Sequence, residues 1–478
     1  MVDWIALFVS FVSIAGVLLG AEGLHRLGVS TATTRRIVHL IVCFFVASTP
    51  WLFSESAPVC GLAALFVIMN GAARARGWWP GIHAAHPRSW GTVAVPLAVL
   101  PAAAIAWSGS GDHRLAFQTS FLVLGLADPL AAVVGHRYGI HSLTKTASAA
   151  GTGVFAATTS LLVGAVLVWA GRGGPQALGA AVGAGGVAAA VEAIGQHGWD
   201  NLFIVVAVVV VLVALQRQIL GVPGLLGSVG IGGVVAGGAW GLAVLTRRGA
   251  VGAGLFAATL VGLGGWAWAA PGFAFFMLSS ALSVLPGGGG DRPSRRLRQV
   301  LANGGVAWGL LLIALGTGPN PSTGSTRWYI GFLGALAAAA ADTWATELGT
   351  RYGGPPWSLW EGRRVAFGTS GAVSYLGTGG AALGALSVVA APALSGTIGG
   401  DGLLCGAGAG LAGMAADSLL GAIVQARYKD PETGRMRDTP IPGDDSVQRG
   451  WRWIDNDIVN LVGTAVGAGT AVALIQIV

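Results

Sequence analysis

Apolar runs long enough to cross a lipid bilayer recur throughout this chain of 478 residues. The first three extend from Trp4 to Leu24, from Ile37 to Phe53 and from Cys60 to Ala73, and comparable runs follow as far as the C-terminus. A transmembrane helix needs about 20 mainly apolar residues, because it satisfies its own backbone hydrogen bonds inside a hydrocarbon layer about 30 Å thick. The pattern therefore predicts an all-α, polytopic integral membrane protein with roughly 14 to 16 transmembrane helices.

The charged residues indicate how such a protein would be oriented. They make up only 10% of the chain, and the formal net charge of +7 comes from arginines that cluster between the apolar runs. Such clusters mark cytoplasmic loops, and with both termini outside, every cluster falls on the cytoplasmic side. The positive charge thus reports membrane orientation, and nucleic acid is not expected as a partner. The 79 glycines suit helices that pack closely together in lipid.

The motif Asp-x6-Gly-x-Arg-Tyr-Gly occurs twice, beginning at Asp128 and at Asp342, each time at the end of an apolar run. A carboxylate within a membrane segment is costly and is generally functional. Two copies with identical spacing therefore indicate a duplicated functional site. The alternative is that each aspartate forms a structural ion pair with the arginine of its own motif, which is Arg137 or Arg351.

Further polar residues follow both copies of the motif in the same order. The first set is Gly151-Thr152, Glu192 and Asp200-Asn201, and the second set is Gly368-Thr369, Asp417 and Asp455-Asn456. The apolar pattern breaks between the two copies near Arg217. We therefore predict two related helical bundles, residues 1–217 and 218–478, that are oriented in parallel so that both sites face the cytoplasm.

This combination of side chains suits a metal-bound triphosphate. Carboxylates hold Mg²⁺, arginine and lysine neutralise phosphate, and the backbone at glycine can approach phosphate oxygens closely. Phosphoryl transfer depends mainly on positioning and charge neutralisation, so a general base is optional. All eight histidines lie in the first half of the chain, and only the carboxylates are therefore common to both sites.

Two sets of motifs resemble known enzyme families. The first half carries Arg35-Arg36-x-x-His39, Ala127-Asp128, Gly135-x-x-Tyr138-Gly139, Lys145 with Gly151-Thr152, and Glu192-x7-Asp200-Asn201. In these it resembles the phytol kinase, dolichol kinase and related CTP-dependent polyprenol kinases. The second half carries Arg298 to Gly304, Asp342-Thr343 with Glu347-Leu348-Gly349, Gly368-Thr369, Asp417 to Gly421, and Trp453 to Asp457 with Asn460. It is similar to the family of transmembrane protein 19 and phytyl-phosphate kinase.

The two resemblances together imply a bifunctional kinase of prenyl lipid or tocopherol biosynthesis. The first half would convert phytol, geranylgeraniol or farnesol to the monophosphate, and the second half would convert this product to the diphosphate, with CTP as donor and Mg²⁺ as cofactor. Catalytic roles fall to Asp128, Asp200, Asp342 and Asp455. Metal binding falls to Asp128, Glu192, Asp200, Asp342, Glu347, Asp417, Asp455 and Asp457. Nucleotide binding falls to Arg36, His39, Lys145, Gly151, Thr152 and Asn201 in the first half, and to Arg298, Asn303, Arg364, Gly368, Thr369, Asn456 and Asn460 in the second.

Other functions fit the same pattern of residues. A transporter would use Asp128 and Asp342 to bind a cation or proton, and a cytidylyltransferase would make a CDP-linked lipid and release pyrophosphate. One half can also be an inactive scaffold for the other. The sequence leaves open the prenyl chain and the nucleotide, because no residue in it is recognisable as a contact to cytosine or to a chain of particular length. It also leaves open the oligomeric state and whether the monophosphate is channelled between the sites.

Overall fold

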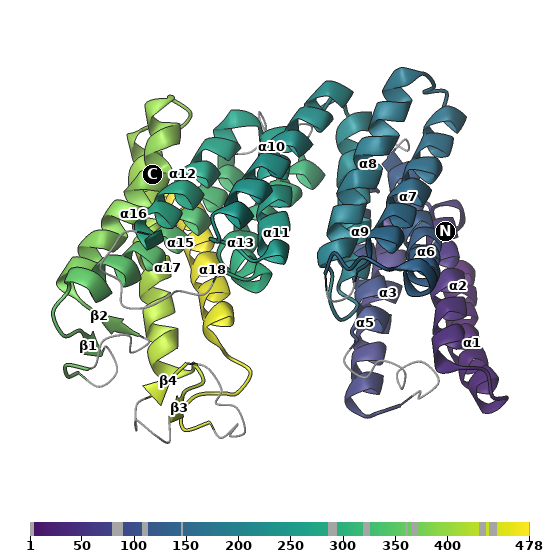
Figure 1. The fold of residues 1–478 in the computed structure, drawn as a ribbon, viewed down its shortest axis with the longest axis horizontal. Helices are drawn as coiled ribbons and strands as arrows, with labels where there is room; N and C mark the ends of the chain where they lie inside the picture. The colour runs from purple at the N-terminus through teal and green to yellow at the C-terminus, as the bar shows by residue number, and fades with distance from the viewer. Residues whose placement is uncertain are drawn as a thin grey trace. The chain divides into compact units, whose positions relative to one another are not determined.

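The computed structural model describes residues 4–78, 89–107, 113–144, 147–284, 294–318, 326–358, 362–365, 371–429, 436–438 and 447–477. These residues are almost entirely helical (Figure 1). They contain twelve helical segments that are long and apolar enough to cross a membrane. The prediction of an all-α, polytopic integral membrane protein is confirmed. Among the described residues, the apolar helices α5 and α9 are not included in these twelve, because they have only 16 and 17 residues.

The chain divides into two compact units, Met1–Val229 and Gly230–Val478, with the division inside helix α10. The first unit contains α1 (Trp4–Arg26), α2 (Thr31–Leu52), α3 (Ser56–Ala75), α5 (Gly91–Ala106), α6 (Arg114–Tyr138), α7 (Ala149–Trp169), α8 (Pro175–Ile194), α9 (Asp200–Gln216) and the start of α10 (Val222–Gly241). Helix α6 lies at its centre and packs against α2, α5, α7 and α9. The α6 side chains Phe117, Phe121 and Leu124 are fully buried there.

The second unit contains the rest of α10, α11 (Arg247–Thr259), the π-helical turn η2 (Leu260–Gly264), α12 (Gly265–Val284), α13 (Leu297–Thr317), α15 (Thr326–Tyr352), α16 (Tyr375–Leu394), α17 (Gly400–Ile423) and α18 (Asn456–Leu474). Its central helix is α15, which packs against α12, α13, α16, α17 and α18. Residues 337–341 of α15 are all alanine and all buried. Small side chains let neighbouring helices approach α15 closely on several sides.

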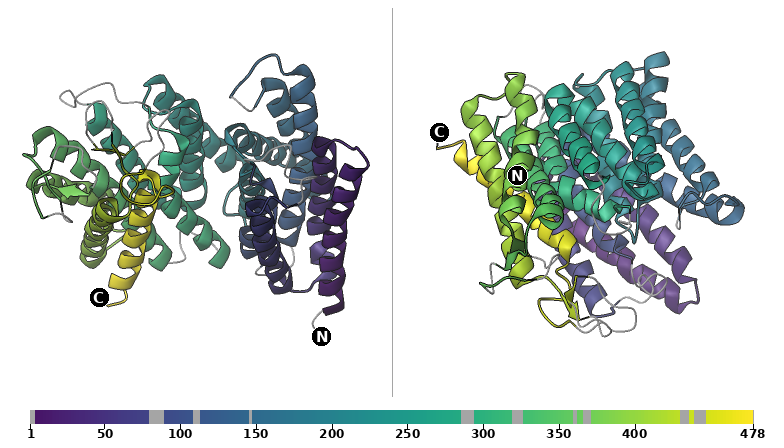
Figure 2. Two further views of the ribbon diagram at one scale, coloured as in Figure 1. Left: turned by 90° about the horizontal axis from the view of Figure 1, so that it is seen from below. Right: turned by 60° about the vertical axis from the view of Figure 1, so that its left-hand side comes forward.

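Two short antiparallel hairpins interrupt the helices of the second unit. Strands β1 (Trp357–Ser358) and β2 (Ala372–Val373) form one hairpin, and β3 (Tyr428–Lys429) and β4 (Met436–Arg437) form the other. Both lie at the same end of this unit, and Figure 2 shows α18 running alongside α17 from that end. The hairpins therefore mark the end of the unit at which α15 and α17 end and α16 and α18 begin.

Several helices begin at a side chain that satisfies the first free backbone amides. Ser30, Ser148, Thr246 and Ser374 each accept a hydrogen bond from the amide three residues later, at the starts of α2, α7, α11 and α16. Asp455 does the same for α18 by accepting from the amide of Ile458. Because a cap fixes where a helix starts, it also fixes which side chains of the first turns face the neighbouring helices.

Candidate functional site

In the second unit, two of the predicted carboxylates meet in one cavity. Asp342 of α15 and Asp417 of α17 line a cavity of about 170 Å³ together with Asn303 of α13 and Asn460 of α18. The two carboxylates are close enough to repel one another electrostatically. Four helices that are distant in sequence thus converge on one polar site. This site contains Asp342, the aspartate with which the second copy of the repeated motif begins.

The amide of Asn460 links this cavity to the start of α18. In the orientation that satisfies its neighbours, its nitrogen donates to the Asp417 Oδ2 atom at 3.0 Å and to the carbonyl of Asn456 at 3.0 Å. Its oxygen then faces the side chain of Asn303 at 3.3 Å. Asn460 therefore orients one carboxylate of the pair and ties it to the first turn of α18.

A second acidic cluster lies at the start of α18. Arg298 of α13 forms ion pairs with Asp455 at 2.7 Å and with Asp457 at 3.2 Å. The Arg298 side chain is 59% exposed, so these pairs are within reach of a soluble ligand. A phosphate group that binds Arg298 would compete with both carboxylates for the same guanidinium group.

Two further predicted residues of the second half, Glu347 and Arg364, do not line the cavity. Glu347 pairs instead with Arg351 at 3.4 Å and accepts a hydrogen bond from Ser283 at 3.0 Å. The reason is helical phase, since five residues separate Glu347 from Asp342 and place it roughly 140° further around α15. Arg364 is exposed and pairs through its backbone with Trp357 of β1. Gly368 and Thr369 lie outside the described residues.

In the first unit, the predicted carboxylates also come together. Asp128 of α6, Glu192 of α8 and Asp200 of α9 interact electrostatically with one another. Glu192 additionally accepts a hydrogen bond from the Thr152 hydroxyl at 3.1 Å, which brings the Gly151-Thr152 pair to the same site. The structure therefore assembles the first acidic set from four different helices.

Among the described residues, Arg35 lies beside these carboxylates, whereas the predicted cation was its neighbour Arg36. Arg35 interacts with Asp128 and Asp200 and donates to the Ser89 hydroxyl at 2.6 Å, whereas Arg36 is exposed. The helical phase of His39 is the signal that identifies Arg35, because residues four apart share one face of a helix. Lys145, the other predicted cation, lies outside the described residues.

His39 lies between the acidic set and the core of the unit. Its Nε2 atom is 3.1 Å from the carbonyl oxygen of Leu124 and 3.8 Å from the Asp128 carboxylate. A carbonyl only accepts hydrogen bonds, so Nε2 carries the proton and donates. This hydrogen bond holds α2 against α6. It therefore helps to position Asp128, which follows Leu124 by four residues on α6.

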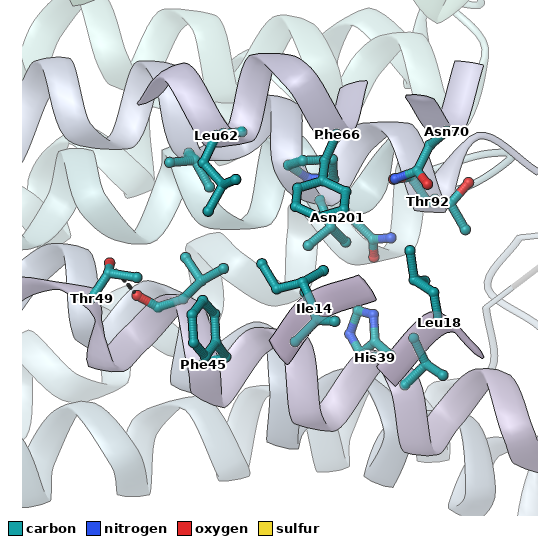
Figure 3. A pocket seen from close by; sticks show the side chains of 18 of the residues that line it. Ile14, Leu18, His39, Phe45, Thr49, Leu62, Phe66, Asn70, Thr92 and Asn201 are labelled. Carbon is teal, nitrogen blue, oxygen red and sulfur yellow. Dashed lines mark hydrogen bonds between the residues drawn. The ribbon is translucent and has the colours of Figure 1, made fainter. Parts of the chain in front are cut away.

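A large apolar pocket opens beside the acidic set of the first unit. It has a volume of about 950 Å³ and is lined by α1, α2, α3 and α5, with Asn201 of α9. In Figure 3, Asn70, Thr92 and Asn201 lie toward one end, while Thr49 and Leu62 lie toward the other. Along α2 the lining runs from Arg35 to Thr49, or roughly 20 Å at 1.5 Å per residue. The pocket thus has a long apolar part and a polar end that includes Arg35, which interacts with Asp128 and Asp200.

The two copies of the repeated motif share one local packing geometry. Gly135 of α6 faces Ser148 and Gly151 at the start of α7, and Gly349 of α15 faces Ser374 and Gly377 at the start of α16. Each serine caps its helix, because its hydroxyl accepts a hydrogen bond from the backbone amide of the glycine three residues later. In this packing, Gly377-Thr378 takes the place that Gly151-Thr152 has in the first unit. The shared pattern Ser-x-x-Gly-Thr-Gly, at Ser148 and Ser374, was the signal for it.

This packing makes a prediction with a matched control on one helix. A Cβ atom at Gly377 would come within 2.9 Å of the Ser374 hydroxyl and 3.1 Å of the Ala345 carbonyl, whereas one at Gly379 would meet nothing within 4 Å. We expect Gly377→Leu to lower the apparent melting temperature in detergent by several degrees, because overpacking costs about 1–3 kcal/mol. Gly379→Leu should leave the melting temperature unchanged. Equal effects of the two substitutions would contradict the close approach of α15 and α16.

The acidic residues suit Mg²⁺ only in company with another ligand. Within the residues that the structure describes, no set of three or more histidine, cysteine or acidic side chains is arranged to hold a metal ion by itself. Mg²⁺, however, is usually bound by one or two carboxylates together with waters and substrate phosphates. The pair Asp342 and Asp417 supplies such a donor set, and the amide of Asn460 keeps it oriented. The residues therefore fit a metal ion that arrives with a nucleotide.

A comparison with protein families finds a match in the second half of the chain. Residues 231–468 match the family described as integral membrane protein DUF92. An uncharacterized membrane protein of Methanocaldococcus jannaschii is 33% identical over 138 residues, which are 29% of this chain and 54% of that protein. The chain thus spans about half the length of this curated relative. No solved structure matches the chain. From residue 231 to residue 468, the chain is therefore similar to the DUF92 family of integral membrane proteins.

Proposed function

We propose that the protein is a bifunctional prenyl alcohol kinase, in which the first unit makes the monophosphate and the second unit makes the diphosphate. The observation that carries the proposal is the long apolar pocket of the first unit, which is lined at its polar end by Arg35, a residue that interacts with Asp128 and Asp200. An amphiphile with one hydrocarbon chain and one hydroxyl group fits such a pocket, with the chain in the apolar part and the hydroxyl at the carboxylates.

The two reactions balance as phosphoryl transfers. In the first, the alcohol oxygen forms a bond to the γ-phosphorus of the nucleoside triphosphate, the bond from that phosphorus to the β–γ bridging oxygen breaks, and the nucleoside diphosphate leaves. The hydroxyl proton passes to a carboxylate or to water. In the second, an oxygen of the lipid monophosphate attacks in the same way and the product is a diphosphate. Bound Mg²⁺ would supply charge neutralisation on the phosphates.

The residues of the two units would divide these tasks similarly. Asp128, Glu192 and Asp200 would face the metal-bound phosphates in the first unit, and Asp342 and Asp417 would do so in the second. Arg35 and Arg298 would neutralise phosphate charge, and Asn201 and Asn460 would orient the neighbouring groups. The choice of CTP as donor rests on the family resemblance, and the cytoplasmic orientation of both sites rests on the arginine distribution.

The test is an assay of the purified full-length protein in detergent with Mg²⁺, phytol and CTP labelled at the γ-phosphate. We expect labelled lipid monophosphate and diphosphate, together with release of CDP. Absence of labelled lipid with every nucleotide and every prenyl alcohol would overturn the proposal. Release of pyrophosphate would indicate a cytidylyltransferase, and ion flux into liposomes without nucleotide would indicate a transporter.

A further inference from the structure

The second unit contains an apolar pocket of its own. It has a volume of about 650 Å³ and is formed by α10, α11, η2, α12 and α13. Its wall is rich in large apolar side chains, including Phe256, Leu260, Phe273 and Phe276. Its polar lining consists of Arg295, Gln299 and Asn303. A pocket with this composition suits a hydrocarbon chain that carries a polar group at one end.

The position of Arg295 is fixed by its backbone. Its amide donates to the carbonyl of Val244 at 3.0 Å, and its carbonyl accepts from the amide of Thr246 at 3.0 Å. These bonds form a parallel bridge between Leu245 and Arg295 just before α13. The backbone that carries the guanidinium side chain is therefore held in place at the edge of the pocket.

The side chain of Arg295 is held by a chain of hydrogen bonds. It donates to the Ser283 hydroxyl at 2.9 Å, and this hydroxyl donates to the Glu347 carboxylate at 3.0 Å. Glu347 is in turn paired with Arg351 at 3.4 Å. A planar guanidinium group held in one orientation is suited to bind a phosphate through two parallel hydrogen bonds.

Polar side chains connect the pocket with the acidic cavity. Gln299 and Asn303 are four residues apart on one side of α13, roughly 6 Å along its axis, and Arg295 lies just before the start of this helix. Asn303 lines both the apolar pocket and the cavity that contains Asp342 and Asp417. A lipid headgroup beside these side chains would therefore lie between Arg295 and the carboxylates of the candidate site.

We propose that this pocket binds a single-chain lipid phosphate, with the hydrocarbon chain among the phenylalanines and the phosphate on Arg295. It rests on the proposed function for the role of the lipid, which is to accept the second phosphoryl group. It adds the residue that selects a lipid phosphate over a lipid hydroxyl. At the first pocket, Arg35 interacts directly with Asp128 and Asp200, and these carboxylates would repel an anionic headgroup. At the second pocket, Arg295 is joined through the Ser283 hydroxyl to Glu347, whose charge is paired with Arg351.

Photolabelling of the full-length protein tests the proposal without turnover. A prenyl monophosphate with a diazirine on its chain is crosslinked in the absence of nucleotide, and the labelled peptides are located by mass spectrometry. We expect label on α11 and α12, and Arg295→Gln should weaken this labelling roughly 10- to 100-fold, which is the order expected when charge-assisted hydrogen bonds are lost. Arg295→Lys should retain part of it. Arg247→Gln removes an exposed arginine of α11 that stacks on Trp240 and should change nothing.

Folding is checked with the corresponding diazirine-bearing prenyl alcohol, whose labelling of the first unit should be the same in every variant. Unchanged phosphate labelling of α11 and α12 in a folded Arg295→Gln protein would overturn the proposal. So would a variant that loses nucleotide binding while it keeps lipid labelling, because Arg295 would then bind the nucleotide. Failure of the kinase assay with labelling intact would instead refute the proposed reaction and leave the lipid phosphate site standing.

Discussion

Asp342→Asn is expected to reduce phosphorylation of a supplied prenyl monophosphate by at least about a hundredfold, and to leave phosphorylation of the prenyl alcohol unchanged. Asp342 and Asp417 share one small cavity. Removing the charge of Asp342 leaves only one of these two carboxylates to bind the metal ion of a metal-bound phosphate. Asparagine is nearly isosteric with aspartate, so the packing of α15 should be preserved. The measurement is the initial rate of each reaction with the purified protein, one lipid substrate at a time.

The reciprocal substitution is the internal control. Asp128→Asn should stop phosphorylation of the alcohol and leave the monophosphate reaction intact, because Asp128 belongs to the acidic set of the first unit. Asp401→Asn removes an exposed aspartate from the first turn of α17 and should affect neither reaction. Loss of both activities in either single variant would mean one composite site in place of two independent ones.

Glu347→Gln is expected to destabilise the second unit by about 3–5 kcal/mol, the usual effect of leaving a buried charge without its partner. The side chains of Glu347 and Arg351 are only 7% and 2% exposed, and their ion pair is 3.4 Å long. Glutamine still accepts the hydrogen bond from Ser283, so the substitution isolates the loss of charge. For a unit of this size, the apparent melting temperature should fall on the order of 10 °C.

A second pair with the same spacing provides the comparison. Glu22 and Arg26 of α1 are also four residues apart, at 3.5 Å, but the arginine side chain is 78% exposed. Exposed pairs contribute only about 0–1 kcal/mol, so Glu22→Gln should leave the melting temperature nearly unchanged. If Glu347→Gln instead preserved stability and abolished phosphorylation of the monophosphate, Glu347 would be a metal ligand as the family resemblance implies.

The alternative of a local ion pair within each repeated motif can be judged from the same geometry. Arg351 pairs with Glu347 and donates to the carbonyls of Leu282 and Ser283, all on a side of α15 away from Asp342. Arg137 stacks on the ring of the neighbouring Tyr138. An arginine nine residues after an aspartate lies roughly half a turn away around the helix. Spacing alone therefore argues against the pair, and the described contacts agree.

The sequence by itself determined the class of the protein and most of the acidic residues that meet in each unit. Runs of about 20 apolar residues leave no alternative to membrane helices, and a carboxylate in such a run stands out whatever surrounds it. Asp128, Glu192 and Asp200, and likewise Asp342 and Asp417, were therefore recognisable before the fold. The repeat was recognisable too, because its motif keeps identical spacing in both halves.

The tertiary structure alone decided which neighbours those carboxylates have. Arg35 and not Arg36 reaches Asp128, Glu347 turns away from Asp342, and Gly377 packs against Gly349 as Gly151 packs against Gly135. Each of these outcomes depends on the helical phase and on where a capping serine starts the next helix. Both pockets were also invisible in the sequence, because in a membrane protein an apolar side chain that lines a pocket has the same character as one that faces lipid or another helix.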